Sequence, residues 1–187
     1  MRIYGNRPLK TLPGPLTRPT TARVREALFN IWQANILGCS WLDLCAGNGS
    51  MGAEALCRGA KSVVGIEQSG RACDIIRENW QKIALPDQGF RILRGNVLTE
   101  LATLSGQSFD YIYFDPPYES PLYQPVLEAI AGYQLLAPGG EIAVEHRSKQ
   151  WQPVTIDPLR VSRTKVYGNT ALTFYHPYID RRGCDVN

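Results

Sequence analysis

The sequence predicts an α/β fold in which a doubly wound, mostly parallel sheet ends in a C-terminal antiparallel hairpin. Between residues 20 and 145, segments rich in β-forming residues alternate with segments of helical periodicity, and this alternation favours parallel strands joined by helices. Near the end of the chain, residues 164–167 and 170–175 flank Gly168-Asn169, which is a typical hairpin turn.

Length and composition indicate one globular domain. The chain has 187 residues, of which 44% are hydrophobic and 20% charged, and this size supports a sizeable core. We expect a basic arm over residues 1–19 and a single domain over residues 20–187.

No apolar run approaches the ~18 residues of a membrane span, and the N-terminus lacks the apolar core of a signal peptide. The five cysteines are scattered without a Cys-x-x-Cys spacing, so we expect no disulfide framework, no metal site, and a reduced cytoplasmic protein. We also expect a monomer.

The basic arm stands out by its charge. Residues 1–25 hold six basic side chains and no acidic one, while the rest of the chain has fourteen basic against seventeen acidic groups. This asymmetry indicates a polyanion-binding segment on a nearly neutral body, although a solvated tail would show the same composition. The prolines and glycines up to residue 19 favour an extended or turn-rich arm, with a short hairpin as a variant, over a helix.

A first helix follows the arm. Pro19-Thr20-Thr21 offers an N-terminal cap. Arg23 and Arg25 stand in the first turn, where cations oppose the helix dipole, and a bound polyanion would explain them. An apolar stripe at helical spacing predicts that the helix packs on the body through Val24, Ala27, Leu28, Ile31 and Trp32.

The first strand leads into a glycine-rich loop. Residues 41–45 are typical of a buried strand, and Gly47, Gly49 and Gly52 follow in a G-x-G-x-x-G pattern that opens a helix. Glycine lets the backbone approach a ligand closely. The second predicted strand, residues 62–67, ends in Glu67 about 20 residues after the loop, where an acid that binds ribose hydroxyls is expected. The loop and the acid together indicate a nucleotide site.

The middle of the chain continues the alternation. The pattern predicts, in order, a helix over residues 69–83, a strand over 90–94, a short helical connection around 98–104, a strand over 110–114, a helix over 122–136 and a strand over 141–145.

The tetrad Asp115-Pro116-Pro117-Tyr118 has the most specific chemistry. It follows the strand over residues 110–114, and its prolines cannot donate to a sheet ladder, so the strand must end there. A rigid elbow then lies at the sheet edge where α/β proteins bind ligands. A carboxylate and a backbone carbonyl can each accept one N–H of an exocyclic amine, while the Tyr118 ring stacks on the heterocycle. A proline-terminated turn with a surface acid is the alternative.

Two features argue against a dinucleotide dehydrogenase. An antiparallel hairpin replaces the second mononucleotide half, and Asp43 precedes Gly47 in a Leu-Asp-x-x-Ala-Gly-x-Gly pattern. This pattern resembles class I S-adenosylmethionine methyltransferases. The resemblance implies that the loop holds the methionine moiety of S-adenosylmethionine, that Glu67 binds its ribose, and that Asn96, where many members have Asp, meets its adenine. The implied cofactor contacts are Asp43, Cys45, Ala46, Gly47, Asn48, Gly49, Glu67, Asn96 and Val97.

A longer resemblance covers nearly the whole chain. Residues 18–29 (RPTTARVREALF), residues 42–56 (LDLCAGNGSMGAEAL) and the tetrad are similar to segments of the RsmD family, which are 16S ribosomal RNA guanine-N2 methyltransferases. The chain begins Arg2-Ile-Tyr-Gly-Asn6 where members usually have Arg-Ile-x-Gly-Gly. The resemblance implies a target guanine in 16S rRNA of the small ribosomal subunit or its assembly intermediate. It also implies four catalytic residues: Asp115, Pro116, Pro117 and Tyr118.

RNA contacts are expected in the arm and the first helix, where cations would meet phosphates: Arg2, Arg7, Lys10, Arg18, Thr20, Arg23 and Arg25. The target base must be unstacked from the RNA to reach the tetrad. An adenine-N6 methyltransferase on DNA or RNA would use the same tetrad, so residue chemistry leaves both amines open. A non-catalytic RNA-binding domain is an alternative of another class, but it would need neither the loop nor the tetrad.

Overall fold

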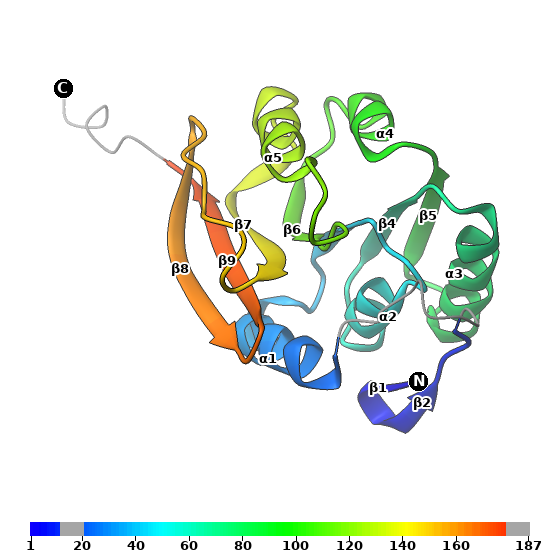
Figure 1. Ribbon diagram of the computed structural model, residues 1–187. Coiled ribbons are helices and arrows are strands. Elements are labelled where there is room, and N and C mark those ends of the chain that lie inside the picture. Colours follow the sequence, from blue (N-terminus) through cyan, green and yellow to red (C-terminus); the bar gives the residue numbers. More distant parts are fainter. Residues whose placement is uncertain (12–20, 179–187) are drawn as a thin grey trace, which may run out of the picture.

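A seven-stranded sheet forms the centre of the molecule (Figure 1). The computed structural model describes residues 1–11 and 21–178. The strands lie in the order β5-β4-β3-β6-β7-β9-β8, and β9 runs antiparallel to both of its neighbours. The predicted sheet and hairpin are therefore confirmed. Their bounds are β3 Ser40–Leu44, β4 Ser62–Glu67, β5 Gly89–Arg94, β6 Phe109–Phe114, β7 Leu136–Arg147, β8 Leu159–Tyr167 and β9 Thr170–Pro177.

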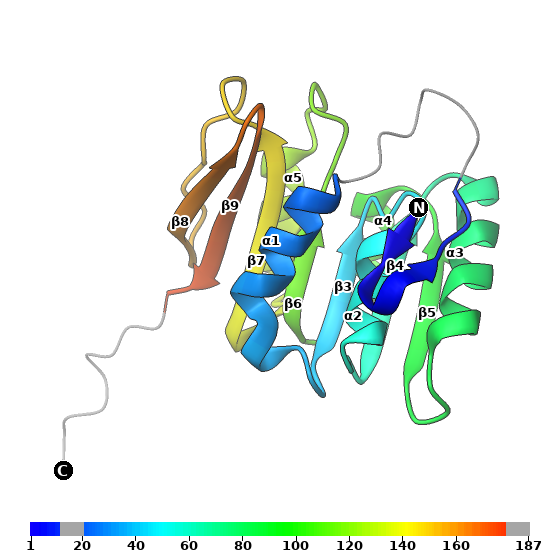
Figure 2. The ribbon, with the colours of Figure 1, turned by 90° about the horizontal axis from the view of Figure 1, so that it is seen from below.

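Helices cover both faces of the sheet (Figure 2). Successive side chains of a strand enter opposite cores: Trp41 belongs to the core under α1 to α3, and Leu42 to the core under α4 and α5. Burial on both faces explains the nearly continuous buried runs of β3, β4 and β6. The helices are α1 Ala22–Trp32, α2 Ser50–Cys57, α3 Gly70–Ile83, α4 Val97–Thr103 and α5 Tyr123–Gly132.

The boundary between α5 and β7 differs from its prediction. The helix expected over residues 122–136 ends at Gly132, and β7 already begins at Leu136. Gln134 has a φ of 54°, a left-handed conformation that cannot continue a helix. Leu136 then pairs with Phe109 of β6. Pairing with β6 thus places residues with helical periodicity in a strand.

The hairpin β8–β9 closes one end of the sheet. Gly168 adopts a φ of 66° in the turn, as the Gly-Asn pattern requires. β8 is the outermost strand and contains the basic residues Arg160, Arg163 and Lys165. Arg163 forms a bidentate pair with Glu141, with nitrogen–oxygen distances of 2.7 and 2.8 Å.

An aromatic cluster docks α1 on the sheet. The Phe29 ring stacks on Trp41 with centroids 5.2 Å apart, and Trp32 meets Trp41 edge-on at 5.5 Å. The Trp32 indole N–H also donates to Glu141 Oε2 at 2.7 Å. At the other end, the Thr21 hydroxyl caps the helix by accepting the Val24 N–H at 3.3 Å.

Arg25 lies on the buried face of α1, so the prediction that it contacts RNA is wrong. Only 3% of its surface is exposed. Its guanidinium donates to the Arg2 carbonyl oxygen at 2.8 Å, and its Nε lies 3.3 Å from Glu54 Oε2. The buried face of α1 is wider than its apolar residues suggest, because an arginine with a buried acidic partner can also occupy a core position.

The N-terminal residues form a short hairpin that packs on the body. β1 (Arg2–Ile3) pairs antiparallel with β2 (Arg7–Pro8), joined by the short helix η1 (Tyr4–Asn6), and a second such helix, η2 (Gln33–Asn35), follows α1. The side chains of Ile3 and Leu9 are buried in the core under α1 to α3. Arg18 and Thr20 of the predicted arm lie outside the described residues.

Glu54 of α2 joins this hairpin to the body. Its carboxylate is 2% exposed and accepts the Tyr4 backbone N–H at 3.0 Å. It also accepts two N–H bonds from Arg58, at 3.0 and 2.9 Å, and lies against Arg25. One buried carboxylate therefore compensates two arginines.

We expect Glu54→Ala to lower the free energy of unfolding by about 3–5 kcal/mol, because it leaves Arg25 and Arg58 without their counter-charge. Urea denaturation followed by tryptophan fluorescence measures the change. Asp74→Ala is the matched control, since Asp74 pairs with Arg77 but is 73% exposed, and its loss should cost less than about 1 kcal/mol. Equal losses for the two variants would contradict the compensating role of Glu54.

Candidate active site

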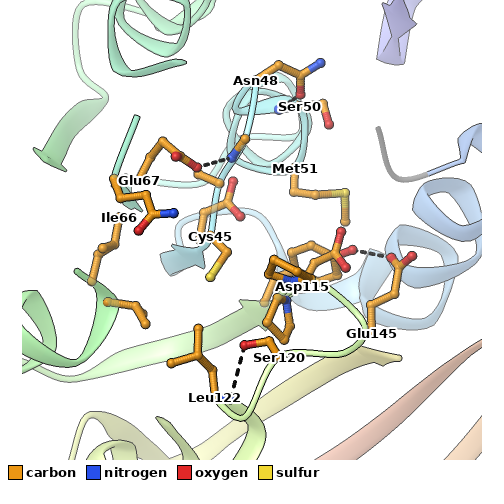
Figure 3. A pocket seen from close by; sticks show the side chains of 18 of the residues that line it. Cys45, Asn48, Ser50, Met51, Ile66, Glu67, Asp115, Ser120, Leu122 and Glu145 are labelled. Atoms are coloured by element: carbon orange, nitrogen blue, oxygen red, sulfur yellow. Dashed lines mark hydrogen bonds between the residues drawn. The ribbon is translucent and has the colours of Figure 1, made fainter. Parts of the chain in front are cut away.

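A cavity of about 890 Å³ lies where β3, β4, β6 and β7 end. The strand order reverses between β3 and β6, and open α/β sheets bind ligands at such a switch point. Glu67 lies at one end of the cavity, and Asp115 and Glu145 lie at the other (Figure 3). Eight of the nine predicted cofactor residues line this cavity: Asp43, Cys45, Ala46, Gly47, Asn48, Glu67, Asn96 and Val97.

The loop after β3 is held in an unusual backbone conformation. Cys45 and Gly47 both have a φ of 58°, and a left-handed conformation at Cys45 is uncommon for a residue with a side chain. The Glu67 carboxylate accepts the Gly47 N–H at 2.9 Å and the Ser69 N–H at 2.8 Å. The acid that ends β4 therefore fixes the loop that ends β3.

Gly49 is the ninth predicted cofactor residue, and the structure places it behind the cavity wall. It has a φ of 71° and caps α2. A Cβ at Gly49 would lie 2.8 Å from Trp80 Nε1, and a Cβ at Gly52 would lie 2.3 Å from Trp80 Cζ2. Only glycine at these two positions leaves room for the Trp80 indole of α3, so the motif combines one cavity-lining glycine, Gly47, with two packing glycines.

Asp43 is a buried acid at the end of β3. Its carboxylate accepts the Gly52 N–H at 2.9 Å. Burial raises the pKa of Asp43 to about 8, an effect that the Gly52 N–H opposes and the charge of Glu67 increases. Its contact with the first turn of α2 ties the loop to that helix.

Cys45 faces three acids. Burial and the charges of Glu67, Asp115 and Asp43 raise the pKa of its thiol to about 12. Because the thiolate is the nucleophilic form, Cys45 stays a neutral thiol near pH 7. A neutral thiol at this position is a weak nucleophile, so the environment of Cys45 does not favour covalent catalysis.

Asn96 and Val97 begin α4 at the end of β5. The Asn96 side chain caps the helix by accepting the Leu98 N–H at 2.9 Å, and Val97 is buried beside it. Both line the cavity on the side of Glu67. Asn suits this position because it serves as a helix cap as well as a wall of the cavity.

The tetrad turns away from β6 as predicted. Asp115 and Tyr118 are half-buried, Pro116 is buried, and all four residues of the tetrad line the cavity. The Ser120 N–H donates to the Pro117 carbonyl oxygen at 2.8 Å, which closes the turn. The Arg147 guanidinium lies over the Tyr118 ring, 5.3 Å from its centroid.

Glu145, at the end of β7, is the residue that sequence reasoning missed. It is 3% exposed and lines the cavity near the tetrad. The Tyr113 hydroxyl donates to Glu145 Oε2, and the Tyr118 hydroxyl donates to Oε1 at 3.4 Å. An acid at the end of a strand was the available signal, as it was for Glu67.

A second cavity of about 320 Å³ adjoins Tyr118 and Arg147. Among the described residues no acidic side chain lines it, and its other walls are hydrogen-bonding groups and the cation Lys149: Ser148, Lys149, Gln150, Asn169 and Thr170. This donor-rich hollow suits a phosphate group.

The remaining predicted RNA contacts lie on the surface of the described part of the chain. Arg2, Arg7 and Arg23 are exposed, and Lys10 pairs with Glu78 of α3. Met1, Thr11 and Thr21 are the described residues of the N-terminal region that line the large cavity.

Residues 1–11 and 21–178 contain neither a membrane-spanning helix nor a metal-binding cluster. No helix there is long and apolar enough to cross a membrane. No group of three or more His, Cys, Asp or Glu side chains there is arranged to hold a metal ion.

Comparison with known proteins identifies relatives along nearly the whole chain. The family model described as Conserved hypothetical protein 95 matches residues 1–176. The Bacillus subtilis protein YlbH is 32% identical over 171 residues, which cover 90% of this chain and 92% of that protein. Ribosomal RNA small subunit methyltransferase D of Escherichia coli is 30% identical over 179 residues, which cover 94% and 89%.

A solved structure gives the same result. The Escherichia coli protein yhhF superposes with a TM-score of 0.81 at 30% identity, over 95% of this chain and 97% of that chain. Fold, site and sequence thus agree, and the chain belongs to the Conserved hypothetical protein 95 family, the family of the RsmD methyltransferases.

Proposed function

We propose that the protein transfers a methyl group from S-adenosylmethionine to the exocyclic N2 of a guanine in 16S ribosomal RNA of the small subunit. One observation carries this proposal: a single cavity joins the glycine loop after β3 to the Asp-Pro-Pro-Tyr elbow after β6. A cofactor on the loop and a base on the elbow would meet inside it. The relatives named as methyltransferases of small-subunit ribosomal RNA support the substrate class.

The cavity suits S-adenosylmethionine. Its volume falls in the range of small-molecule sites. The Gly47 backbone has no side chain to block the methionine moiety, Glu67 offers a carboxylate to the ribose hydroxyls, and Asn96 with Val97 forms the adenine wall. When bound, the cofactor supplies an electrophilic methyl group on a sulfonium, which is an intrinsically good leaving group.

The elbow would prepare the target amine. The guanine amine is a poor nucleophile because its lone pair is delocalised into the ring. Asp115 and the Pro116 carbonyl would accept its two N–H groups and favour a pyramidal nitrogen, whose lone pair then points along the cavity. Alignment of this kind contributes up to ~7–11 kcal/mol in well-oriented systems. Asp115 is also the group placed to take up the proton that the nitrogen releases.

The Tyr118 ring would stack on the unstacked base. Glu145 and Thr170 hold its hydroxyl, at 3.4 and 3.3 Å, and Arg147 covers its ring. A ring fixed in this way is already oriented before the base arrives. The second cavity, which Tyr118 and Arg147 also line, would take a phosphate next to the target nucleotide.

We expect Glu67→Ala to weaken S-adenosylmethionine binding roughly 10- to 100-fold, because a charged acceptor for the ribose is lost together with the support of Gly47. Isothermal calorimetry measures the affinity. Glu128→Ala, an exposed acid on α5, is the control and should bind normally. Saturable NAD binding without any response to S-adenosylmethionine would refute the cofactor assignment.

Asp115→Ala should lower the rate of methyl transfer about 100- to 1,000-fold or more, because the acceptor that orients the amine is lost. The affinity for S-adenosylmethionine should stay nearly the same, since the lost contact is to the base. Transfer of a tritiated methyl group to small-subunit RNA from cells lacking the protein measures the rate, and nucleoside mass spectrometry identifies the product. Normal turnover by Asp115→Ala would show that the tetrad does not bind the amine.

Arg23 at the start of α1 should contact an RNA phosphate. Arg23→Ala should weaken RNA binding and flatten its salt dependence by roughly 0.7–0.9 units of log slope, without changing which base is methylated. Binding across a salt series measures the slope. Arg91 of β5 is exposed and lines neither cavity, so Arg91→Ala is the control. The same slope for Arg23→Ala and the unaltered protein would make this cation an ordinary surface charge.

A further inference from the structure

Glu145 is a buried carboxylate for which the mechanism above has no direct use. It lies at the end of β7, which neighbours β6 in the sheet, so it stands beside the elbow that follows β6. Figure 3 shows its side chain pointing toward the side of the cavity where Asp115 lies. A carboxylate so deeply buried is costly unless something compensates it.

The neighbours of Glu145 use it as a hydrogen-bond acceptor. The hydroxyls of Tyr113 and Tyr118 both donate to it, one to each carboxylate oxygen. Each carboxylate oxygen has a second lone pair, so Glu145 can still accept a donor from a ligand in the cavity. The base end of the cavity therefore presents acceptors from two acids, Asp115 and Glu145.

Guanine and adenine differ in the hydrogen-bonding group at N1, which lies next to the exocyclic amine and would face these acceptors. Guanine has an N1–H donor next to its N2 amine, so its edge places three N–H bonds side by side. Adenine has a lone pair at N1 next to its N6 amine. Unstacked bases are read along these edges. An acceptor beside the amine site accepts from guanine N1–H and repels adenine N1.

We propose that Glu145 accepts the N1–H of the unstacked guanine and thereby selects guanine over adenine. This inference rests on the proposed function and adds the residue that reads the base. Asp115 and Pro116 hold the amine that reacts, whereas Glu145 holds the neighbouring ring nitrogen, which does not react. Sites built to bind a substrate N–H or O–H discriminate strongly against an analogue without it, because the site's own polar group is left without its partner.

A supporting role would have a different signature. Glu145 also holds the Tyr118 hydroxyl, so its loss would disturb the stacking ring. Such a disturbance slows every base that stacks there to a similar extent. A reading role changes the ratio between bases that differ at N1, and this ratio is the quantity to measure.

The experiment uses 2-aminopurine, which keeps the reactive 2-amine but has a lone pair at N1. Small-subunit RNA is ligated with guanine or 2-aminopurine at the methylated position, and kcat/KM for methyl transfer is measured on both. The unaltered protein should prefer guanine by about 10- to 100-fold or more. In Glu145→Gln, the amide can donate to N1 of 2-aminopurine, so the preference should shrink by about 10-fold or more.

Two controls separate reading from support. Tyr113→Phe removes a hydroxyl that donates to Glu145 but keeps the carboxylate, so it should leave the preference for guanine in place. Calorimetry with S-adenosylmethionine should give Glu145→Gln the same affinity as the unaltered protein, which shows that the variant is folded.

Two results would overturn the inference while leaving the proposed function intact. One is equal use of guanine and 2-aminopurine by the unaltered protein, which needs no variant at all. The other is a slower Glu145→Gln with the original preference, which would make Glu145 a support for Tyr118. Absence of methyl transfer to any guanine of small-subunit RNA would instead overturn the proposed function, and the inference with it.

Discussion

The contact of Trp80 with the backbone at three glycines is the interaction on which the cofactor loop depends. A Cβ on Gly49, Gly52 or Gly65 would approach the indole to 2.8, 2.3 and 2.6 Å. The indole N–H also donates to the Gly49 carbonyl oxygen at 2.7 Å. One side chain of α3 therefore fixes the start of α2 against β4. The loop between β3 and α2 has little freedom left, and its left-handed residues are held in place by this packing.

The cavity is rich in acceptors, and the surrounding protein offsets the cost of burying them. Backbone N–H groups of Gly52 and Gly47 donate to Asp43 and Glu67. Phenol groups donate to Glu145. An acceptor-lined cavity suits ligands that bring their own donors, as purine amines and ribose hydroxyls do. Burial of the Cys45 thiol, together with the same concentration of negative charge, raises its pKa.

Much of this arrangement follows from local patterns. The strand ends, the glycine motif and the proline elbow are properties of short segments. The sequence was therefore enough to predict the fold and to predict that Glu67 and Asp115 lie at the same edge of the sheet. Tertiary partners decided the rest. Arg25 is buried because its guanidinium pairs with the buried carboxylate of Glu54, which lies 29 positions further along the chain. Gly49 packs against Trp80 instead of lining the cavity, and Glu145 lies beside the tetrad only because β7 lies beside β6.

The outermost position of β8 has a consequence for self-association. An edge strand presents unpaired backbone groups on which a second copy of the chain could build. Along β8, however, stand the long charged side chains of Arg160, Arg163 and Lys165, of which Arg160 pairs with Asp157 and Arg163 with Glu141. A copy of the same strand laid alongside would have to take these charged groups out of water. Charged side chains thus oppose edge-to-edge growth of the sheet, even though Val161 and Val166 are exposed on the same strand.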